Sequence, residues 1–402
     1  MSVEDGPAVS NAPATDSLAS NDPSLVRARR LLYGALVTFT GGLLAGTAWD
    51  VYFHSRNTFD SFWTPPHLVL YLGVVSAGAF AFVAARNPEL RRWFGPPYRF
   101  PLVSAPIPGC LALTAGGVLV MLLGGALDDL WHSTYGLDET RWSLPHAMIA
   151  WGAFLVVLGL FGCRLALSAH RPISSRGRLL WAVIVLGFSL AVFLGPFFLS
   201  TTPDSMGRIS RLPGFQGAET QHYFRVVAAS DLYRTNLGFP ALVGLWAGVG
   251  LAIVKGLDDR ARFLFIVTAG TAAVATTLGL LTAIYVGTLE SIATWLAPPV
   301  FIAPAAWILL RRWTSSNLAF LALSGAALGL CTSLIYGFEP VRAVTSLAAS
   351  ATMVVGTFAG QRLLRVAEKP TPSSAARAIP IVGVAVPTAL GVLDMLLRAG
   401  TP

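Results

Sequence analysis

Charged residues are scarce in this chain. Asp, Glu, Lys and Arg make up 12% of the 402 residues, whereas hydrophobic residues make up 54%. A soluble chain of this length would fold as two or three domains with charged surfaces, and the composition excludes that. Apolar runs long enough to cross a bilayer recur along the sequence and are too long for barrel strands. The composition therefore predicts an all-α, polytopic integral membrane helical bundle.

Cysteine is also rare. Cys110, Cys163 and Cys331 stand singly in or at the ends of apolar runs, and no CxxC pair occurs. This pattern argues against a thiolate metal site or a disulfide and favours small buried hydrophobic side chains. The first 25 residues lack an apolar run, so we expect neither a signal peptide nor a span in 1–25 but a disordered cytoplasmic tail. The net charge of +8 requires no nucleic-acid partner, because arginines that flank membrane spans explain it.

The apolar runs predict about 11 transmembrane helices. With the N-terminus in the cytoplasm, most of the 28 Lys and Arg residues fall on the cytoplasmic side, as the positive-inside rule requires. This predicts a protein of the cytoplasmic (inner) membrane with its C-terminus outside. The predicted spans are 31–53, 66–85, 108–127, 146–168, 179–199, 237–255, 263–287, 291–310, 317–337, 343–361 and 378–397.

Two stretches of similar sequence hold four of the six His residues. The first, WDVYFHSRNTFDSFWTPPH, runs from residue 49 to 67, and the second, DDLWHSTYGLDETRWSLPH, runs from 128 to 146. In each, an Asp precedes a His by four positions, and a second His follows by thirteen or fourteen. The repeated polar residues are Asp50, His54 and His67 in the first copy and Asp128, His132 and His146 in the second.

This spacing predicts two metal sites. Residues four apart lie on one face of a helix, and the second His, at the start of the next helix beside Pro66 or Pro145, supplies a third ligand. Three ligands with an open position suit a catalytic or binding metal site, and a carboxylate with imidazoles suits copper, zinc or non-haem iron. We expect Asp60, Asp129 and Asp138 to hydrogen-bond the ligands or cap loops rather than bind metal.

The predicted topology puts both sites at the extracytoplasmic face, each on a helix–loop–helix hairpin. Residues 26–170 would form a four-helix metal-site module with two repeats, and 171–402 would add further transmembrane helices of unknown role. We expect Asp50 and Asp128 in the last turn of their helices, where the helix dipole disfavours a carboxylate and a bound cation would offset that cost. The competing interpretation is an ion pair in which Asp50 contacts His54 or Arg56 and Asp128 contacts His132.

The spacing resembles that of the C subunit of copper membrane monooxygenases, the family of particulate methane and ammonia monooxygenases. Asp50, His54 and His67 match its Asp-x3-His-x12-His triad, while His132 and His146 match its second triad, in which Asp128 replaces Asn. The resemblance covers about residues 31–168. It implies copper at both triads, oxygen activation and hydroxylation of a small hydrophobic substrate. It also implies partner subunits or an electron donor, because no flavin or haem motif is present.

Three functions from different classes remain open on the sequence. The first is a copper-dependent membrane monooxygenase or its metal-bearing subunit. The second is a zinc-dependent intramembrane hydrolase in which Asp60 or Asp138 would act as general base. The third is a non-catalytic membrane protein, such as a metal-binding protein, a metal transporter, a sensor or a scaffold. The identity of the bound metal distinguishes the first two functions, copper for the oxygenase and zinc for the hydrolase. A scaffold would differ from both in tolerating replacement of the predicted ligands by Ala.

Overall fold

The computed structural model describes residues 22–56, 61–100, 105–135, 144–199, 238–258, 260, 262–267, 270–271, 351–352 and 354–362. Within these residues 86% are helical, which confirms the predicted helical class. In the part of the chain that the structure describes, four helices are long and apolar enough to cross a membrane. Most of the predicted tail, the long segment 200–236 and most of the five spans predicted after residue 262 lie outside the described residues.

The helices that carry the repeats form two hairpins. The first consists of α2 (Pro23–Arg56) and α3 (Pro65–Arg86), and the second of α5 (Gly109–Tyr135) and α6 (Leu144–Ser168). Prolines occupy the first turn of α3, as predicted, because the missing N–H there is one that a helix leaves unpaired anyway. The helices α7 (Ser175–Leu199) and α10 (Gly238–Leu257) match the fifth and sixth predicted spans.

The prediction that Asp50 and Asp128 lie in the last turn of their helices is wrong. The helix α2 continues to Arg56 and α5 continues to Tyr135. The apolar run marks only the part of a helix that suits lipid, whereas hydrogen bonding continues the helix into more polar sequence. Each Asp therefore lies well inside its helix, and the helix dipole contributes little to its energy, because that effect is confined to the last turn.

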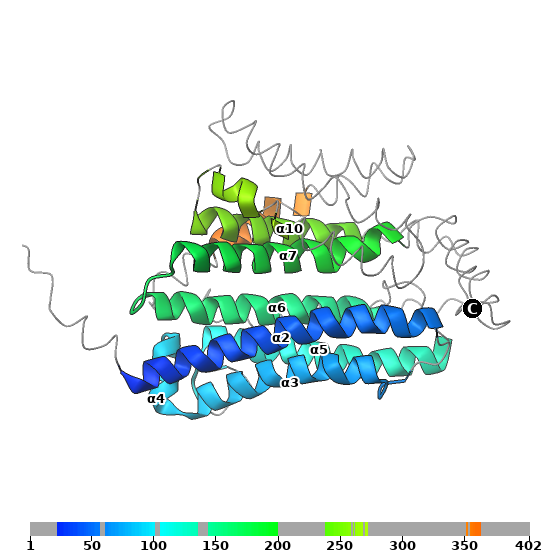
Figure 1. The fold of residues 1–402 in the computed structure, drawn as a ribbon, viewed down its shortest axis with the longest axis horizontal. Helices are drawn as coiled ribbons and strands as arrows, with labels where there is room; N and C mark the ends of the chain where they lie inside the picture. Colours follow the sequence, from blue (N-terminus) through cyan, green and yellow to red (C-terminus); the bar gives the residue numbers. More distant parts are fainter. Residues whose placement is uncertain are drawn as a thin grey trace, which may run out of the picture.

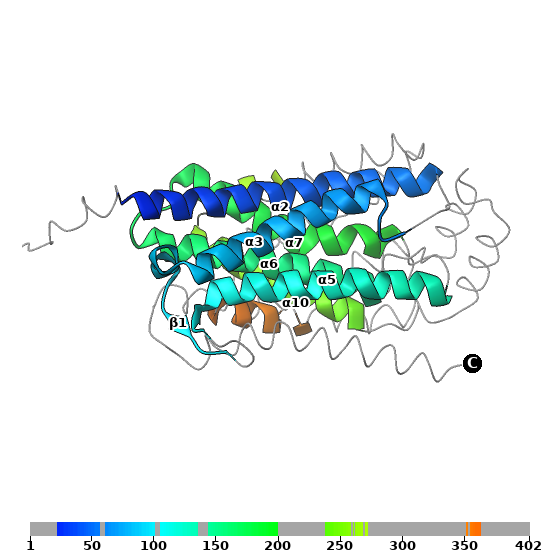
Figure 2. The ribbon, with the colours of Figure 1, turned by 90° about the horizontal axis from the view of Figure 1, so that it is seen from below.

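The two hairpins pack side by side, with α6 at the centre of the bundle. The helix α3 contacts both α2 and α5, and α6 contacts α5, α2 and α7, while α10 packs on α7. Figure 2 shows α3 lying between α2 and α5 along the bundle. In the most apolar stretch of α6, 78% of the residues are buried inside the protein, compared with 28% in that of α2. Large apolar side chains on the outer faces of α3 and α5, such as Leu72, Phe82 and Leu119, are exposed, as lipid-facing residues are in a bilayer.

Glycine residues bring the helices of each hairpin into close contact. A Cβ placed on Gly73 of α3 would lie 3.2 Å from the carbonyl oxygen of Phe39 in α2, and one on Gly152 of α6 would lie 2.6 Å from that of Gly117 in α5. Gly152 follows Gly73 by 79 positions and Gly117 follows Phe39 by 78, which are the offsets between the repeated His residues. The two hairpins therefore cross at the same register, as expected for two copies of one unit.

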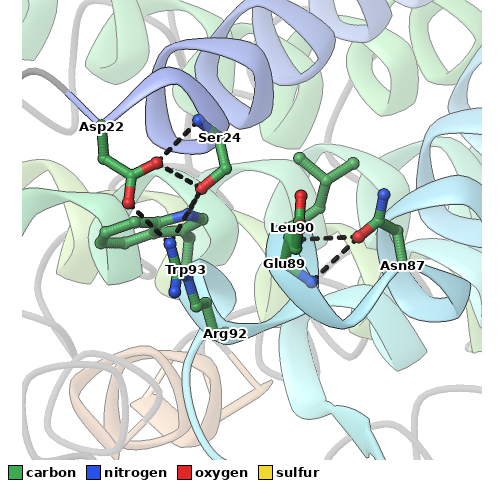
Figure 3. Close-up of polar contacts among 7 residues, drawn as sticks. All are labelled: Asp22, Ser24, Asn87, Glu89, Leu90, Arg92 and Trp93. Carbon is green, nitrogen blue, oxygen red and sulfur yellow. Dashed lines mark hydrogen bonds and ion pairs between the residues drawn. The ribbon is translucent and has the colours of Figure 1, made fainter.

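At one end of the bundle, polar contacts fasten α2 to the short helices α4 (Pro88–Arg91) and η1 (Arg92–Phe94) (Figure 3). The carboxylate of Asp22 caps α2 by accepting hydrogen bonds from the backbone N–H and the hydroxyl of Ser24. Arg92 donates to Asp22, and the Trp93 indole N–H donates to Ser24 Oγ at 2.8 Å. The hydrogen bonds from Ser24 and the nearby Arg92 guanidinium lower the pKa of Asp22.

This end of the bundle is strongly basic. The start of α2, the segment around α4, the α6–α7 turn and the end of α10 all meet here (Figure 1). Arg164 is 5% exposed; it donates from Nε to the Tyr33 hydroxyl and from Nη2 to the carbonyl of Arg171, which joins α2 to that turn. Beyond α10, the hydrogen bond from Arg260 lowers the pKa of Asp258 to about 2. The repeated Asp residues lie at the opposite end.

The glycine contacts generate the first test. We expect Gly152→Ala to destabilise the protein by about 1–3 kcal/mol, because the added Cβ meets backbone atoms of α5 that cannot move without separating the helices. Unfolding in mixed micelles of increasing SDS content would measure this. The matched control is Gly187→Ala in α7, where nothing lies within 4 Å of the added Cβ; it should be neutral or stabilising by up to about 1 kcal/mol. Equal destabilisation of both variants would contradict the close crossing.

Candidate metal site

The backbone places the six predicted ligands at equivalent positions of the two hairpins. Asp50 and His54 both belong to α2, and Asp128 and His132 both belong to α5, so the four-residue spacing lies on a helix in each copy. The remaining pair, His67 and His146, are each the third residue of the following helix. The structure describes the side chains of Asp50, His67 and Asp128; those of His54, His132 and His146 lie outside the described part.

The side chains of Asp50 and His67 meet across the first hairpin. Nε2 of His67 lies 3.2 Å from Oδ1 of Asp50, and the two side chains are 15% and 23% exposed. On its other side the ring contacts the chain that leads into α3, with Nδ1 2.9 Å from the carbonyl oxygen of Ser61. Two of the three ligands predicted for the first site are therefore neighbours, although they stand 17 positions apart in the sequence.

The Ser61 carbonyl determines which ring nitrogen carries the proton. A carbonyl oxygen only accepts hydrogen bonds, so Nδ1 of His67 must be the N–H donor. In neutral imidazole the other nitrogen then presents a lone pair, and that lone pair faces a carboxylate oxygen. The contact is favourable only if a positive charge lies there, either a proton on Nε2 or a metal ion bound by both atoms. The contact therefore calls for a proton or a metal ion between the two atoms.

The separation of the two atoms also suits a metal ion. Two ligands with bonds of about 2.0–2.1 Å to one ion stand roughly 2.9–3.4 Å apart when the angle between them is 90–110°, and the observed distance is 3.2 Å. Metal-bound His residues commonly donate their other N–H to a backbone carbonyl or carboxylate, which orients the ring. The Ser61 carbonyl has that position, so these residues fit a metal as judged by donor chemistry and spacing.

A glycine one turn before each Asp creates this approach. Gly46 precedes Asp50 by four residues, and a Cβ placed there would lie 3.0 Å from the backbone N of Leu70, three residues after His67. The absence of a side chain lets α2 approach the first turn of α3 closely enough for the carboxylate to reach the imidazole. The position of the glycine therefore determines the register between the Asp and the His of the next helix.

The second hairpin repeats this geometry. A Cβ on Gly124, four residues before Asp128, would lie 3.1 Å from the backbone N of Ile149, three residues after His146. Asp128 is 8% exposed, so the acid is buried in α5. Since the same contact is present with the same offsets, we expect Asp128 and His146 to form the pair that Asp50 and His67 form.

The turn before α3 also joins the two copies. The carbonyl of Ser61 accepts a hydrogen bond from the Thr64 backbone N–H as well as from His67. The next residue, Phe62, lies against α5, since a Cβ on Gly125 would be 3.6 Å from its ring. Its ring also packs with Trp63 and Tyr71 at centroid distances of 5.0 and 4.7 Å. This aromatic cluster therefore links the surroundings of His67 to α5 three residues before Asp128.

Of the three other Asp residues in the prediction, the structure describes one. Asp129 is exposed on α5, while Asp60 and Asp138 lie outside the described residues. Among the side chains that the structure describes, no three possible ligands gather at one point. The contribution of Ser61 was not foreseen from the sequence, because it comes from a backbone carbonyl that no side-chain pattern reveals. Comparison of the chain with protein-family models, characterised proteins and solved structures finds no match.

A double-mutant cycle tests the pairing in both hairpins. Replacing Asp50 by Asn and His67 by Gln, singly and together, should reveal a coupling free energy on the order of 1 kcal/mol, because residues in direct polar contact are not additive. The pair Asp128 and His146 should give a coupling of the same sign. Unfolding in SDS-containing micelles supplies the free energies. The control pair is Asp22 and His67, which lie at opposite ends of the bundle and should be additive within about 0.3–0.5 kcal/mol; a coupling equally small for Asp50 and His67 would refute the contact.

Proposed function

We propose that the chain is an integral membrane metalloprotein in which each hairpin contributes one Asp and two His residues to a metal site. The contact between Asp50 and His67 carries this proposal, because its proton arrangement requires a cation. His54, on the same helix as Asp50 and one turn further on, would complete the first site. The corresponding residues of the second hairpin are Asp128, His132 and His146.

Copper is the proposed metal, and a monooxygenase-like activity is the proposed function. Imidazole and carboxylate ligands are compatible with copper, and the resemblance to the C subunit of the copper membrane monooxygenases extends over both triads. A bound copper ion would supply oxygen activation. The Asp in place of Asn at residue 128 adds a negative charge, which would favour a more positively charged metal state at the second site.

The surrounding residues would orient and enclose the proposed site. Ser61 holds the ring of His67 through Nδ1, which leaves Nε2 directed at the site and at Asp50. The carboxylate offsets the positive charge of the cation in a partly buried setting. The aromatic cluster of Phe62, Trp63 and Tyr71 provides an apolar wall beside His67, suited to a small hydrophobic substrate that arrives through the bilayer. Electrons would come from a partner subunit or another donor.

The proposed topology has about 11 spans with a cytoplasmic N-terminus, and the metal sites face the extracytoplasmic side of the inner membrane. The gathering of basic residues at the end opposite the two Asp residues supports this orientation, since cytoplasmic loops are rich in Lys and Arg. Residues 26–170 would be the metal-site module, and the helices of 171–402 would enlarge the bundle.

Metal analysis of the purified protein tests the function. We expect copper in the wild-type protein, loss of about half of it in His67→Ala or His132→Ala, and loss of nearly all of it when both are replaced. His170→Ala is the matched control, because His170 packs against Trp93 at the basic end and should retain all the metal. Mass spectrometry of the metal content gives the ratio.

A different metal, or no metal, would favour a different function. Zinc without copper, together with hydrolysis of a lipid amide or ester in the absence of oxygen, would favour the intramembrane hydrolase. Copper without oxygen consumption on any hydrophobic substrate would favour a non-catalytic metal-binding protein. Wild-type protein that holds no metal after loading would reject the metalloprotein proposal and leave a proton as the cation between Asp50 and His67.

Reporter fusions test the orientation. A fluorescent protein fused after Arg171, in the turn at the basic end, should fluoresce because it stays in the cytoplasm, and alkaline phosphatase fused there should be inactive. The same two reporters inserted after Thr58, between α2 and α3, should give the opposite result. Fluorescence at both positions, or a reversal of the pattern, would contradict the proposed topology.

A further inference from the structure

Two cysteines meet where α5 and α6 lie close together at the basic end. Cys110 is the second residue of α5 and is partly exposed, whereas Cys163 of α6 is fully buried. The Cys110 thiol donates to the carbonyl of Phe94 at 3.3 Å, and the Cys163 thiol lies close enough to Cys110 for the two groups to interact electrostatically. Both are free thiols in the structure, although they are 53 positions apart in the sequence.

The helices α5 and α6 lie close together beside this pair. A Cβ placed on Gly162, the neighbour of Cys163, would lie 3.0 Å from the Cβ of Cys110, and one on Gly159 would lie 2.9 Å from the Cys110 carbonyl oxygen. Glycines at both positions of α6 thus let this helix approach the turn of α5 that carries Cys110. Such an approach is a precondition for a disulfide, whose Cβ atoms are only about 3.5–4.5 Å apart.

The first hairpin shows that packing does not require sulfur at these positions. The two copies are related by an offset of 78 residues in the first helix and 79 in the second. Leu32 is therefore the equivalent of Cys110 in the first hairpin, and Ala84 is the equivalent of Cys163. Both Leu32 and Ala84 are fully buried. An apolar pair therefore fills the corresponding place in one hairpin, and only the second hairpin carries a thiol on each helix.

The two thiols differ in the way that a nucleophile and a resolving cysteine differ. Cys110 is partly exposed at the N-terminal turn of a helix, a position at which reactive cysteines recur, and it lies at the basic end of the bundle. Cys163 is shielded from solvent and follows Gly162, which faces Cys110. A reagent in solution therefore meets Cys110 first, and Cys163 can react only with what has formed on Cys110.

We propose that Cys110 and Cys163 form an oxidisable dithiol that closes to a disulfide by exchange with a low-molecular-weight disulfide. The Cys110 thiolate attacks one sulfur of that disulfide, whose S–S bond breaks and releases a thiol after protonation. Cys163, on losing its proton, then attacks Cys110 Sγ and expels the second thiol. Two protein thiols are oxidised and one small disulfide is reduced to two thiols.

The disulfide would join α5 and α6 at the end of the hairpin where no loop connects them. Residues 136–143 connect the helices at the end that carries Asp128 and His146, and the disulfide would connect them at the opposite end. In the oxidised protein the disulfide would prevent α5 and α6 from sliding past each other, and in the reduced protein this restraint would be absent. The inference is independent of any metal, because it depends on the thiols alone.

Intact mass measurement after alkylation tests the proposal. Full-length protein with Cys331→Ser is purified in detergent, incubated with oxidised glutathione, quenched with acid, denatured in SDS and treated with N-ethylmaleimide. Before oxidation we expect two maleimide adducts. After oxidation we expect none, with a mass lower by two hydrogens and no attached glutathione. If Cys331→Ser does not fold, peptide mapping of the wild-type protein gives the same information.

Single variants separate the roles of the two residues. Cys163→Ala should stop at one glutathione on Cys110, because no resolving thiol remains. Cys110→Ala should take up no glutathione before denaturation and should then accept one maleimide at Cys163. The proposal fails if the Cys331→Ser protein retains glutathione on Cys110 while Cys163 is alkylated, if both thiols survive oxidation, or if Cys163 alone reacts as readily as Cys110.

Discussion

The close approach of two helices at a glycine is the constraint on which the described part of this protein depends. Gly46 and Gly124, each one turn before an Asp, let the first helix of each hairpin come against the backbone of the second. In lipid there is no hydrophobic force between helices, so close van der Waals packing at small residues has to hold them. In the first hairpin the same packing brings the carboxylate of Asp50 within reach of the His67 imidazole.

Charge divides the bundle into two ends with different chemistry. One end gathers arginines and fastens the start of α2 to α4 and η1 through Asp22, Ser24 and Trp93 (Figure 3). The other end has acidic side chains with His67, in surroundings that are partly or fully buried. An acid within apolar helices is costly unless a positive charge accompanies it, and the ring orientation imposed by Ser61 leaves a place for that charge at Nε2.

Much of this arrangement follows from residue patterns. Hydropathy predicted the helices that form both hairpins, and prolines predicted where α3 begins. The repeated spacing predicted equivalent positions for the six proposed ligands along the backbone. The helix ends were predicted less well, since α2 and α5 continue beyond their apolar runs. The pairing of Asp50 with His67 was predicted only by the metal-site interpretation.

The sequence by itself determined the helical class, the two copies and which side chains share a face of one helix, because these depend on a period of 3.6 residues along a single element. The tertiary structure decided which helices touch and at which register: the 3.2 Å contact of Asp50 with His67, the role of the Ser61 carbonyl, and the meeting of Cys110 with Cys163, which the spacing of the cysteines did not reveal. These contacts depend on how two surfaces fit together, and a periodic pattern within one helix does not contain the rotation and translation that relate it to another.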